Sequence, residues 1–339
     1  MRTLLGLTTL LCASIALAAA QTQKPLEVYF IDTEGGQATL FATPSGQSML
    51  IDTGYPGFGD RDVKRVVNTI KQAGFTKLDY FVATHFHEDH IGNAAAIVAQ
   101  VPIGTFIDHG ANVETDAQAK TLFAQYEKAR ATGQYVVAKP GDKIPLRDLD
   151  MTIVSSNGDL ITRPLAGAGA PTPDCAATKP MPADPTENAR SVGSVIAFGR
   201  FRMVDMGDLT WNKELALVCP NNLLGTVDLL LSTHHGRAES NVPPFVHALQ
   251  PRVIVMNNGP KKGGMVDPMK TFKSSPKLED FWQLHYSLDA GDLNQPAPMI
   301  ANLDESTAHY IKLTAQRDGS FAITNARTGQ TKHYAAASR

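Results

Sequence analysis

The feature that most constrains this chain is a ten-residue stretch, T-H-F-H-E-D-H-I-G-N, which runs from Thr84 to Asn93. It follows a short apolar run, residues 78–83, of the length and type of a buried strand, and Gly92 precedes an alanine-rich helical sequence. The stretch is therefore predicted to be a strand-to-helix loop. Its potential metal ligands fall within six positions: His85, His87, Asp89 and His90.

These four side chains predict a metal site. A polar loop that collects histidines for solvation or capping is the alternative, and it accounts better for a lone histidine than for this cluster. Imidazole is the commonest protein ligand for metals, and aspartate adds a hard oxygen. His85 and His87 can point to one side of an extended loop, and Asp89 and His90 to another. The spacing favours two adjacent ions over one.

The H-x-H-x-D-H pattern, placed behind an apolar strand, resembles the signature of the metallo-β-lactamase superfamily. The resemblance implies an α/β fold, a four-layer αββα sandwich with its metals at the sheet edge. It assigns His85 and His87 to one metal site, and Asp89 and His90 to the other. It also implies that Asp52, in the sequence Ile51-Asp52-Thr53-Gly54, lies beneath the ligands and orients a histidine. A turn-forming role for Asp52 is compatible with this one.

Two later strand ends complete the expected ligand set. Asp208 follows an apolar run and is similar to the family's carboxylate that bridges both ions. The H-H-G sequence formed by His234, His235 and Gly236 resembles the branch that contains competence DNA-uptake proteins and phosphorylcholine esterases. Because adjacent residues of a strand point to opposite sides, we expect one histidine, with a slight preference for His235, to bind metal. Its neighbour would act on the substrate as an acid or an oxyanion partner.

One departure from the family concerns a further ligand histidine that many members carry before the bridging aspartate. Only His109 lies in that interval, too early in the chain, and it is either a substrate-side residue or a structural loop residue. Glu187 and Asn188 instead open a stretch that resembles the N-x-x-S sequence of the competence-type branch. One ion is therefore expected to be held more weakly and completed by water, Glu187 or Asn188. The predicted substrate-side residues are Asn188, His109 and His285.

This ligand set predicts a hydrolase that needs no serine or cysteine nucleophile. Two divalent ions would lower the pKa of a shared water toward neutrality, while one of them polarises the substrate oxygen. Mixed nitrogen and oxygen ligands favour zinc, and manganese or iron are the alternatives. The expected substrate is a small ester, phosphodiester or cyclic amide, a β-lactam among them. The predicted catalytic residues are Asp89, His234 and His235. The competing hypotheses are a nuclease-type phosphodiesterase and a non-catalytic binding protein that keeps the fold.

Composition bears on partners and on compartment. The chain has 339 residues and a formal net charge of −2, so a nucleic-acid partner is not favoured and a small-molecule substrate is. Residues 1–20 resemble a signal peptide cleaved after Ala20, which predicts a periplasmic or extracellular protein. No later segment is long and apolar enough to be an anchor. Cys175 and Cys219 would then be either bridged or free thiols. The sequence leaves the oligomeric state open.

Residues 21–339 are predicted to form one metallo-β-lactamase-fold domain. A β-meander is expected through residue 51, followed by a helix around residues 63–70. Two irregular insertions are expected near residues 157–187 and 257–304. The second is either a lid over the site or a surface excursion with one helix, residues 276–286.

Overall fold

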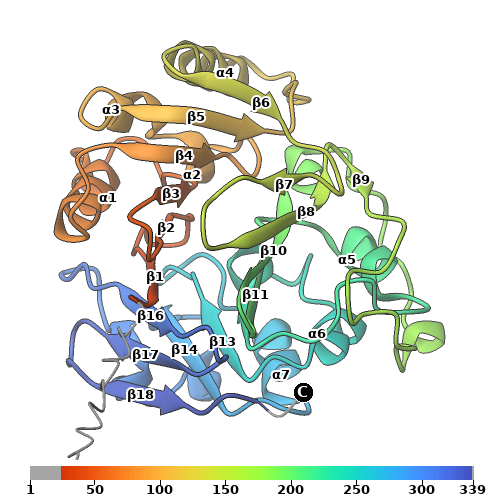
Figure 1. The fold of residues 1–339 in the computed structure, drawn as a ribbon. Coiled ribbons are helices and arrows are strands. Elements are labelled where there is room, and N and C mark those ends of the chain that lie inside the picture. Colours follow the sequence, from red (N-terminus) through yellow and green to blue (C-terminus); the bar gives the residue numbers. More distant parts are fainter. Residues whose placement is uncertain (1–23, 338–339) are drawn as a thin grey trace, which may run out of the picture.

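A computed structural model describes residues 24–337, so the predicted leader, residues 1–20, lies outside the described part of the chain. The described residues form two large β-sheets with helices on their outer faces (Figure 1). No helix in this part of the chain has the length and hydropathy needed to cross a bilayer.

The first sheet combines both ends of the described chain. Its strand order is β18-β17-β16-β1-β2-β3-β4-β5-β6. The predicted meander supplies β1 to β3, and β1 pairs antiparallel with both β2 and β16. From β3 onward the pairs are parallel. The strands are β1 Leu26–Phe30, β2 Thr39–Ala42, β3 Ser48–Ile51, β4 Leu78–Val82, β5 Ile103–Asp108, β6 Gln134–Val137, β16 Ile311–Ala315, β17 Phe321–Asn325 and β18 Thr331–Tyr334.

The second sheet has the order β15-β14-β13-β12-β11-β10-β8-β7, and β9 pairs with β8. The strands from β11 to β15 are parallel, whereas β7, β8, β10 and β11 pair antiparallel. The strands are β7 Lys143–Ile144, β8 Asp150–Ser156, β9 Asp159–Leu160, β10 Gly193–Phe198, β11 Phe201–Asp205, β12 Leu229–Leu231, β13 Val253–Met256, β14 Asp280–His285 and β15 Ile300–Asn302.

The α-helices complete the outer layers. They are α1 Arg61–Gln72, α2 Glu88–Ile91, α3 Ala94–Val98, α4 Ala117–Arg130, α5 Trp211–Val218, α6 Pro243–Leu249 and α7 Val266–Lys273. In α1, the valines at 63, 66 and 67 together with Ile70 are buried, at the spacing of one helical face, as the sequence predicted.

Three apolar layers show how the elements stack. One contains the inward faces of both sheets, with Phe41 and Trp282 among its members. A second joins the first sheet to α1, α3 and α4, through residues such as Ile70 and Tyr126. A third joins the second sheet to α5, α6 and α7, through residues such as Phe245. Two sheets face to face with helices outside each of them make four layers, so the predicted αββα sandwich is confirmed.

The secondary structure predicted for the second insertion was wrong. Residues 257–304 contain α7, β14 and β15, and the segment predicted as a helix, residues 276–286, contains the strand β14 instead. Five of the six β14 residues are buried, because the strand lies between two parallel neighbours and has both faces covered. Such a strand lacks the alternation that marks a half-buried one. Residues 280–285 are therefore part of the second sheet and not of a lid.

The first predicted insertion is irregular and is tied down by a disulfide. Between β9 and the 3₁₀ turn Glu187–Arg190, the chain forms only one short 3₁₀ turn, Cys175–Ala177. Cys175 is bonded to Cys219, just after α5, with Cα atoms 5.7 Å apart. The bond closes a loop whose ends are 44 residues apart in the sequence.

We expect the double variant Cys175→Ser, Cys219→Ser to unfold more easily than the wild type. In the chain-entropy model a closed loop of this size contributes about 4 kcal/mol to the free energy of unfolding. Urea unfolding of both proteins after metal removal would measure the difference, with reduced wild type as the matched control. A difference below about 1 kcal/mol, or a reduced wild type as stable as the oxidised one, would contradict the expectation.

Candidate metal centre

The first part of the site is built where β3 and β4 end side by side. These strands are parallel, so Asp52, just after β3, meets the histidine-rich loop that follows β4. The Asp52 carboxylate accepts hydrogen bonds from the Thr84 N–H at 2.8 Å and from the Thr84 hydroxyl at 2.6 Å. It also lies 2.7 Å from His90 Nδ1. With Nδ1 occupied, His90 presents Nε2 to the site, as expected for a carboxylate that orients a metal ligand.

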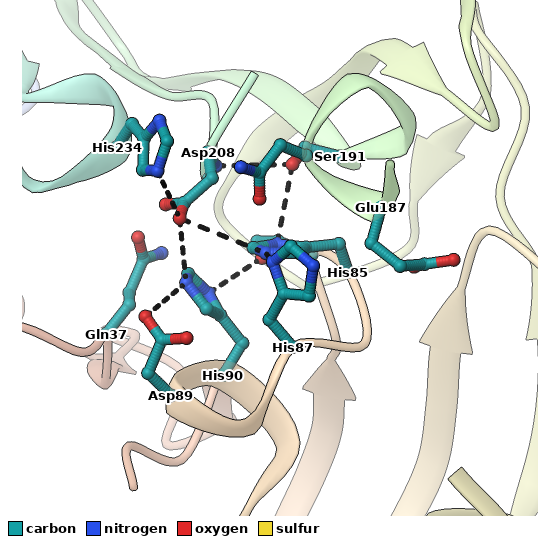
Figure 2. Close-up of polar contacts among 12 residues, drawn as sticks. Gln37, His85, His87, Asp89, His90, Glu187, Ser191, Asp208 and His234 are labelled. Atoms are coloured by element: carbon teal, nitrogen blue, oxygen red, sulfur yellow. Dashed lines mark hydrogen bonds and ion pairs between the residues drawn. The ribbon is translucent and has the colours of Figure 1, made fainter. Parts of the chain in front are cut away.

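The second part comes from the other sheet. Strand β11 ends at Asp205. Gly207, at φ 55°, then turns the backbone so that the Asp208 side chain enters the site. One oxygen, Oδ2, lies 3.3 Å from His90 Nε2, 3.4 Å from His234 Nε2 and 3.9 Å from His85 Nε2. The other, Oδ1, lies 3.2 Å from His235 Nε2. Asp208 is thus in the middle of the imidazoles (Figure 2).

The paired histidines do not follow the predicted alternation. They lie after β12 in a 3₁₀ turn, Thr233–Gly236, and both have left-handed backbones, with φ 51° at His234 and 55° at His235. In this turn both Nε2 atoms reach the Asp208 carboxylate. The strand alternation expected here does not apply, because β12 has ended before His234. Whether one or both imidazoles bind metal stays a prediction.

The two halves of the first motif belong to different groups of ligands. Asp89 Oδ2 lies 3.2 Å from His90 Nε2 and 3.1 Å from His235 Nε2. With Asp208, these residues offer ligand atoms that all lie within 4.8 Å of one another. His87 Nδ1 instead lies 3.0 Å from His85 Nε2. The structure therefore places His235 with Asp89 and His90, and His87 with His85.

Burial and neighbouring charges shift the pKa values of several residues at the centre. Burial would raise the pKa of the Asp208 carboxyl, but the surrounding imidazoles of His235, His234 and His90 hold it well below its ordinary value. Burial lowers the pKa of His234 to about 4, and burial with the neighbouring histidines lowers that of His85. Both imidazoles are then neutral, the form that binds metals.

Unpaired polar atoms give an independent test of whether the residues fit a metal. Among the described residues, His90 Nε2, His235 Nε2 and Asp208 Oδ1 are buried side-chain atoms without a hydrogen-bond partner. Buried polar atoms are rarely left unpaired, because each one costs about 1–3 kcal/mol. All three point into the same small volume, and their nitrogen and oxygen donors are typical zinc ligands. The residues fit a metal centre.

Two of the predicted substrate-side residues lie elsewhere. His109 Nε2 is 2.7 Å from Glu187 Oε2, and this carboxylate also accepts the N–H groups of Phe86 at 3.1 Å and Val113 at 2.7 Å. Glu187 therefore points away from the centre (Figure 2) and is unavailable as the completing ligand. His285 is fully buried, with Nε2 2.7 Å from Asp32 Oδ1. Its predicted contact with substrate was wrong, because it lies on the buried strand β14.

Asn188 is half-buried, and its Oδ1 is a buried atom without a partner. Its place in substrate binding stays a prediction. Next to it in sequence, Ser191 was not singled out, although it ends the N-x-x-S stretch. Its hydroxyl accepts the Asp208 N–H at 3.2 Å and lies 3.4 Å from His85 Nδ1. Ser191 thus orients residues of both halves of the site.

Sequence reasoning also missed Lys262. It lies in the loop between β13 and α7, where its ammonium forms an ion pair with Asp89. Its Nζ atom also lies 5.0 Å from the centre of the Tyr55 ring. A lysine in an irregular loop carries no local signal of function, and only the fold brings it to the centre.

A second cluster, Asp32, Glu34 and His285, resembles a metal site by distance alone. Here arginines supply the positive charge: Arg65 lies 2.8 Å from Asp32 and 2.9 Å from Glu34, and Arg61 also pairs with Glu34. The cluster is an ion-pair network that holds the loop after β1.

Glu214 of α5 is a buried acid close to the turn that carries the paired histidines. It accepts the Val242 N–H at 2.9 Å, and burial raises its pKa to about 8. Nearby, Asn241 accepts the Thr233 N–H at 3.1 Å and donates to the Thr233 carbonyl at 2.8 Å. These contacts hold the turn in which both histidines are left-handed.

Glu214 predicts a pH dependence of stability. The folded protein keeps the proton up to pH about 8, whereas the unfolded chain releases it near pH 4.3. Stability from this group is therefore present at low pH and is lost as the pH rises between these values. The free energy of unfolding of Glu214→Gln minus that of wild type should therefore be larger at pH 8 than at pH 4, by on the order of several kcal/mol.

The measurement is denaturant unfolding of metal-free wild type and Glu214→Gln between pH 4 and 9. Glu305→Gln, a substitution of the same chemistry at an exposed residue, is the control and should give a difference that changes little with pH. A constant difference between wild type and Glu214→Gln across the range would show that Glu214 is ionised in the folded protein.

Comparison with protein families connects this geometry to a known group. Residues 31–175 match the model of the Metallo-beta-lactamase superfamily. The match covers less than half of the 339 residues. The family match covers the Asp52 loop and the H-x-H-x-D-H motif, and the ligands from the second sheet lie beyond it.

Two curated relatives match the chain over parts of their length. ComE operon protein 3 of Bacillus subtilis is 24% identical over 248 residues, which are 69% of this chain and 28% of that protein. The coenzyme F420H(2) oxidase of Methanothermobacter marburgensis is 26% identical over 107 residues, 32% of this chain and 25% of that protein. The chain thus spans about a quarter of the length of each. The first match fits the competence-protein-like branch that the H-H-G and N-x-x-S stretches resemble.

Two solved structures resemble the chain at low sequence identity. The metallo-β-lactamase fold protein YhfI of Bacillus subtilis has 13% identity and a TM-score of 0.47, over 77% of this chain and 96% of that one. CmlA of Streptomyces venezuelae, a diiron β-hydroxylase, has 14% identity and a TM-score of 0.40, over 76% of this chain and 48% of that one.

Proposed function

We propose that this chain is an exported hydrolase that uses two divalent cations, zinc in the first place, on a small ester, phosphodiester or cyclic amide. The observation that carries the proposal is the position of Asp208, whose two oxygens lie among four histidines. A carboxylate in this position can be shared between two ions. One would be held by Asp89, His90 and His235, and the other by His85, His87 and His234.

His234 takes the place of the completing ligand that sequence reasoning sought at Glu187 or Asn188. Its Nε2 lies 3.4 Å from Asp208 Oδ2, the oxygen that also lies 3.3 Å from His90 Nε2 and 3.9 Å from His85 Nε2. Each position then has three side chains besides the shared carboxylate. This set is sufficient for two ions, with four residues from the first sheet and three, Asp208 included, from the second.

Bound metals would polarise the substrate and lower the pKa of a water at the centre. The protein residues have complementary tasks. Asp52 and Ser191 fix the imidazole rings through hydrogen bonds at Nδ1. The Lys262 ammonium lies beside Asp89, where it can bind an anionic group of the substrate or the charge that develops during hydrolysis.

Export is supported by the leader-like residues 1–20 and by the Cys175–Cys219 disulfide, since disulfides persist in oxidising compartments. The net charge of −2 favours a small-molecule substrate over nucleic acid.

The test combines metal analysis of the mature protein with a turnover panel: bis(p-nitrophenyl) phosphate, a p-nitrophenyl carboxylic ester, a chromogenic β-lactam and single-stranded DNA. We expect close to two ions per chain and turnover of a small substrate. Hydrolysis of DNA alone would favour the nuclease-type alternative. Two bound ions without turnover of any member would favour a non-catalytic binding protein and overturn the proposal.

A further inference from the structure

An exposed aromatic side chain stands on a strained loop beside the centre. Phe58 is 69% exposed, the largest value among the exposed large apolar side chains of the described residues. It lies between β3 and α1, where four consecutive residues have left-handed backbones: Gly57 (φ 84°), Phe58 (47°), Gly59 (65°) and Asp60 (59°). A bulky residue in this region is strained, and such strain gathers at functional positions.

The loop is attached to the ligand-bearing helix. Asn93 donates a hydrogen bond to the Tyr55 carbonyl at 2.6 Å. A Cβ atom at Gly92 would come within 2.3 Å of Pro56 Cδ, so only glycine permits this close approach. Tyr55 and Pro56 are therefore held against the residues that directly follow α2, the helix that carries Asp89 and His90.

Aromatic rings connect the loop to the charged centre. The Phe58 and Tyr55 rings meet edge to face, 6.2 Å apart. Lys262 Nζ lies 5.0 Å from the Tyr55 ring centre and pairs with Asp89. The Arg61 guanidinium covers Phe58 at 4.6 Å. A continuous path of contacts thus leads from exposed Phe58, through Tyr55 and Lys262, to a predicted metal ligand.

We propose that Tyr55 and Phe58 form an aromatic wall that binds a flat apolar group of the substrate, while Lys262 binds its anionic group. The inference rests on the proposed function and narrows its substrates to organic anions with an aryl or similar planar substituent. An aromatic contact contributes about 0.5–1.5 kcal/mol beyond area burial. This corresponds to roughly 2- to 13-fold in affinity.

The experiment measures binding, so that it does not depend on turnover. Phenylphosphonate and methylphosphonate are titrated calorimetrically into the zinc-loaded mature protein, because they share the anion and differ in the planar group. We expect the wild type to bind phenylphosphonate more tightly, and Phe58→Ala to lower the ratio of the two affinities about 5-fold. Phe58→Trp should keep the ratio. Val136→Ala, at an exposed apolar residue of β6, is the matched control and should not change it.

Three other results of the binding experiment would contradict the proposed aromatic wall. Equal wild-type affinities would show that no planar group is recognised, and an unchanged ratio in Phe58→Ala would show that Phe58 does not contact the ligand. Absence of binding by either phosphonate would remove the anion contact at Lys262 on which the wall depends. The turnover panel separates these failures from that of the hydrolase proposal: turnover without aryl preference removes only the wall, and aryl preference without turnover removes only the hydrolase.

Discussion

Replacing Asp208 by Asn should empty at least one metal position and lower turnover of any active panel substrate by about 10³-fold or more, because removal of a group that holds the catalytic centre costs several kcal/mol. The isosteric amide keeps the volume of the side chain, but it removes the charge that the surrounding imidazoles face at 3.2–3.9 Å. Metal analysis after dialysis and kcat/KM on the same preparation are the two measurements.

Asp205→Asn is the matched control. Asp205 is a buried aspartate of the same strand end, but its carboxylate accepts hydrogen bonds from the Gln37 amide at 3.1 and 3.0 Å and from the Gly207 N–H at 3.1 Å. It should keep both ions. Full occupancy in Asp208→Asn, or equal metal loss in the two variants, would remove the shared-carboxylate assignment.

His234→Ala and His235→Ala should each lose about one ion, but from different positions. His235 belongs to the compact group with Asp89, His90 and Asp208, whereas His234 lies outside that group and contacts Asp208 through Oδ2. Loss of one ligand from a metal site lowers its affinity, so both variants should lose most of their turnover. This expectation replaces the division into one ligand and one acid, which the strand alternation had predicted.

Cobalt substitution distinguishes the two positions, because the visible spectrum of Co²⁺ depends on its ligands. We expect the single remaining ion to have a different spectrum in each variant. If His234→Ala keeps two ions and loses only turnover, the original division of labour would be right and the present assignment mistaken. His247→Ala, at a histidine of α6 whose Nε2 contacts Ser274 at 2.9 Å, is the control and should keep both ions.

The motif and the strand ends could be predicted, because they depend on local sequence patterns and not on how the elements pack. The H-x-H-x-D-H motif after an apolar strand, the aspartate after β3 and the strand ends before Asp208 and His234 can all be recognised in short windows. The αββα fold followed from them through the family resemblance. Local patterns failed at β14, where burial on both faces removes the alternation that identifies a strand.

The sequence by itself determined which side chains end the strands, because strand length and hydrophobic pattern are local properties. Only the tertiary structure decided which of these side chains meet. The left-handed turn at His234 and His235 is held by Asn241, by a hydrogen bond from the His234 N–H to the Gly207 carbonyl and by one from the Gly264 N–H to the His235 carbonyl. Lys262 reaches Asp89 from 173 residues away in the sequence. Contacts between such distant segments depend on how the two sheets pack. A short stretch of sequence therefore cannot predict which of these segments lie close together.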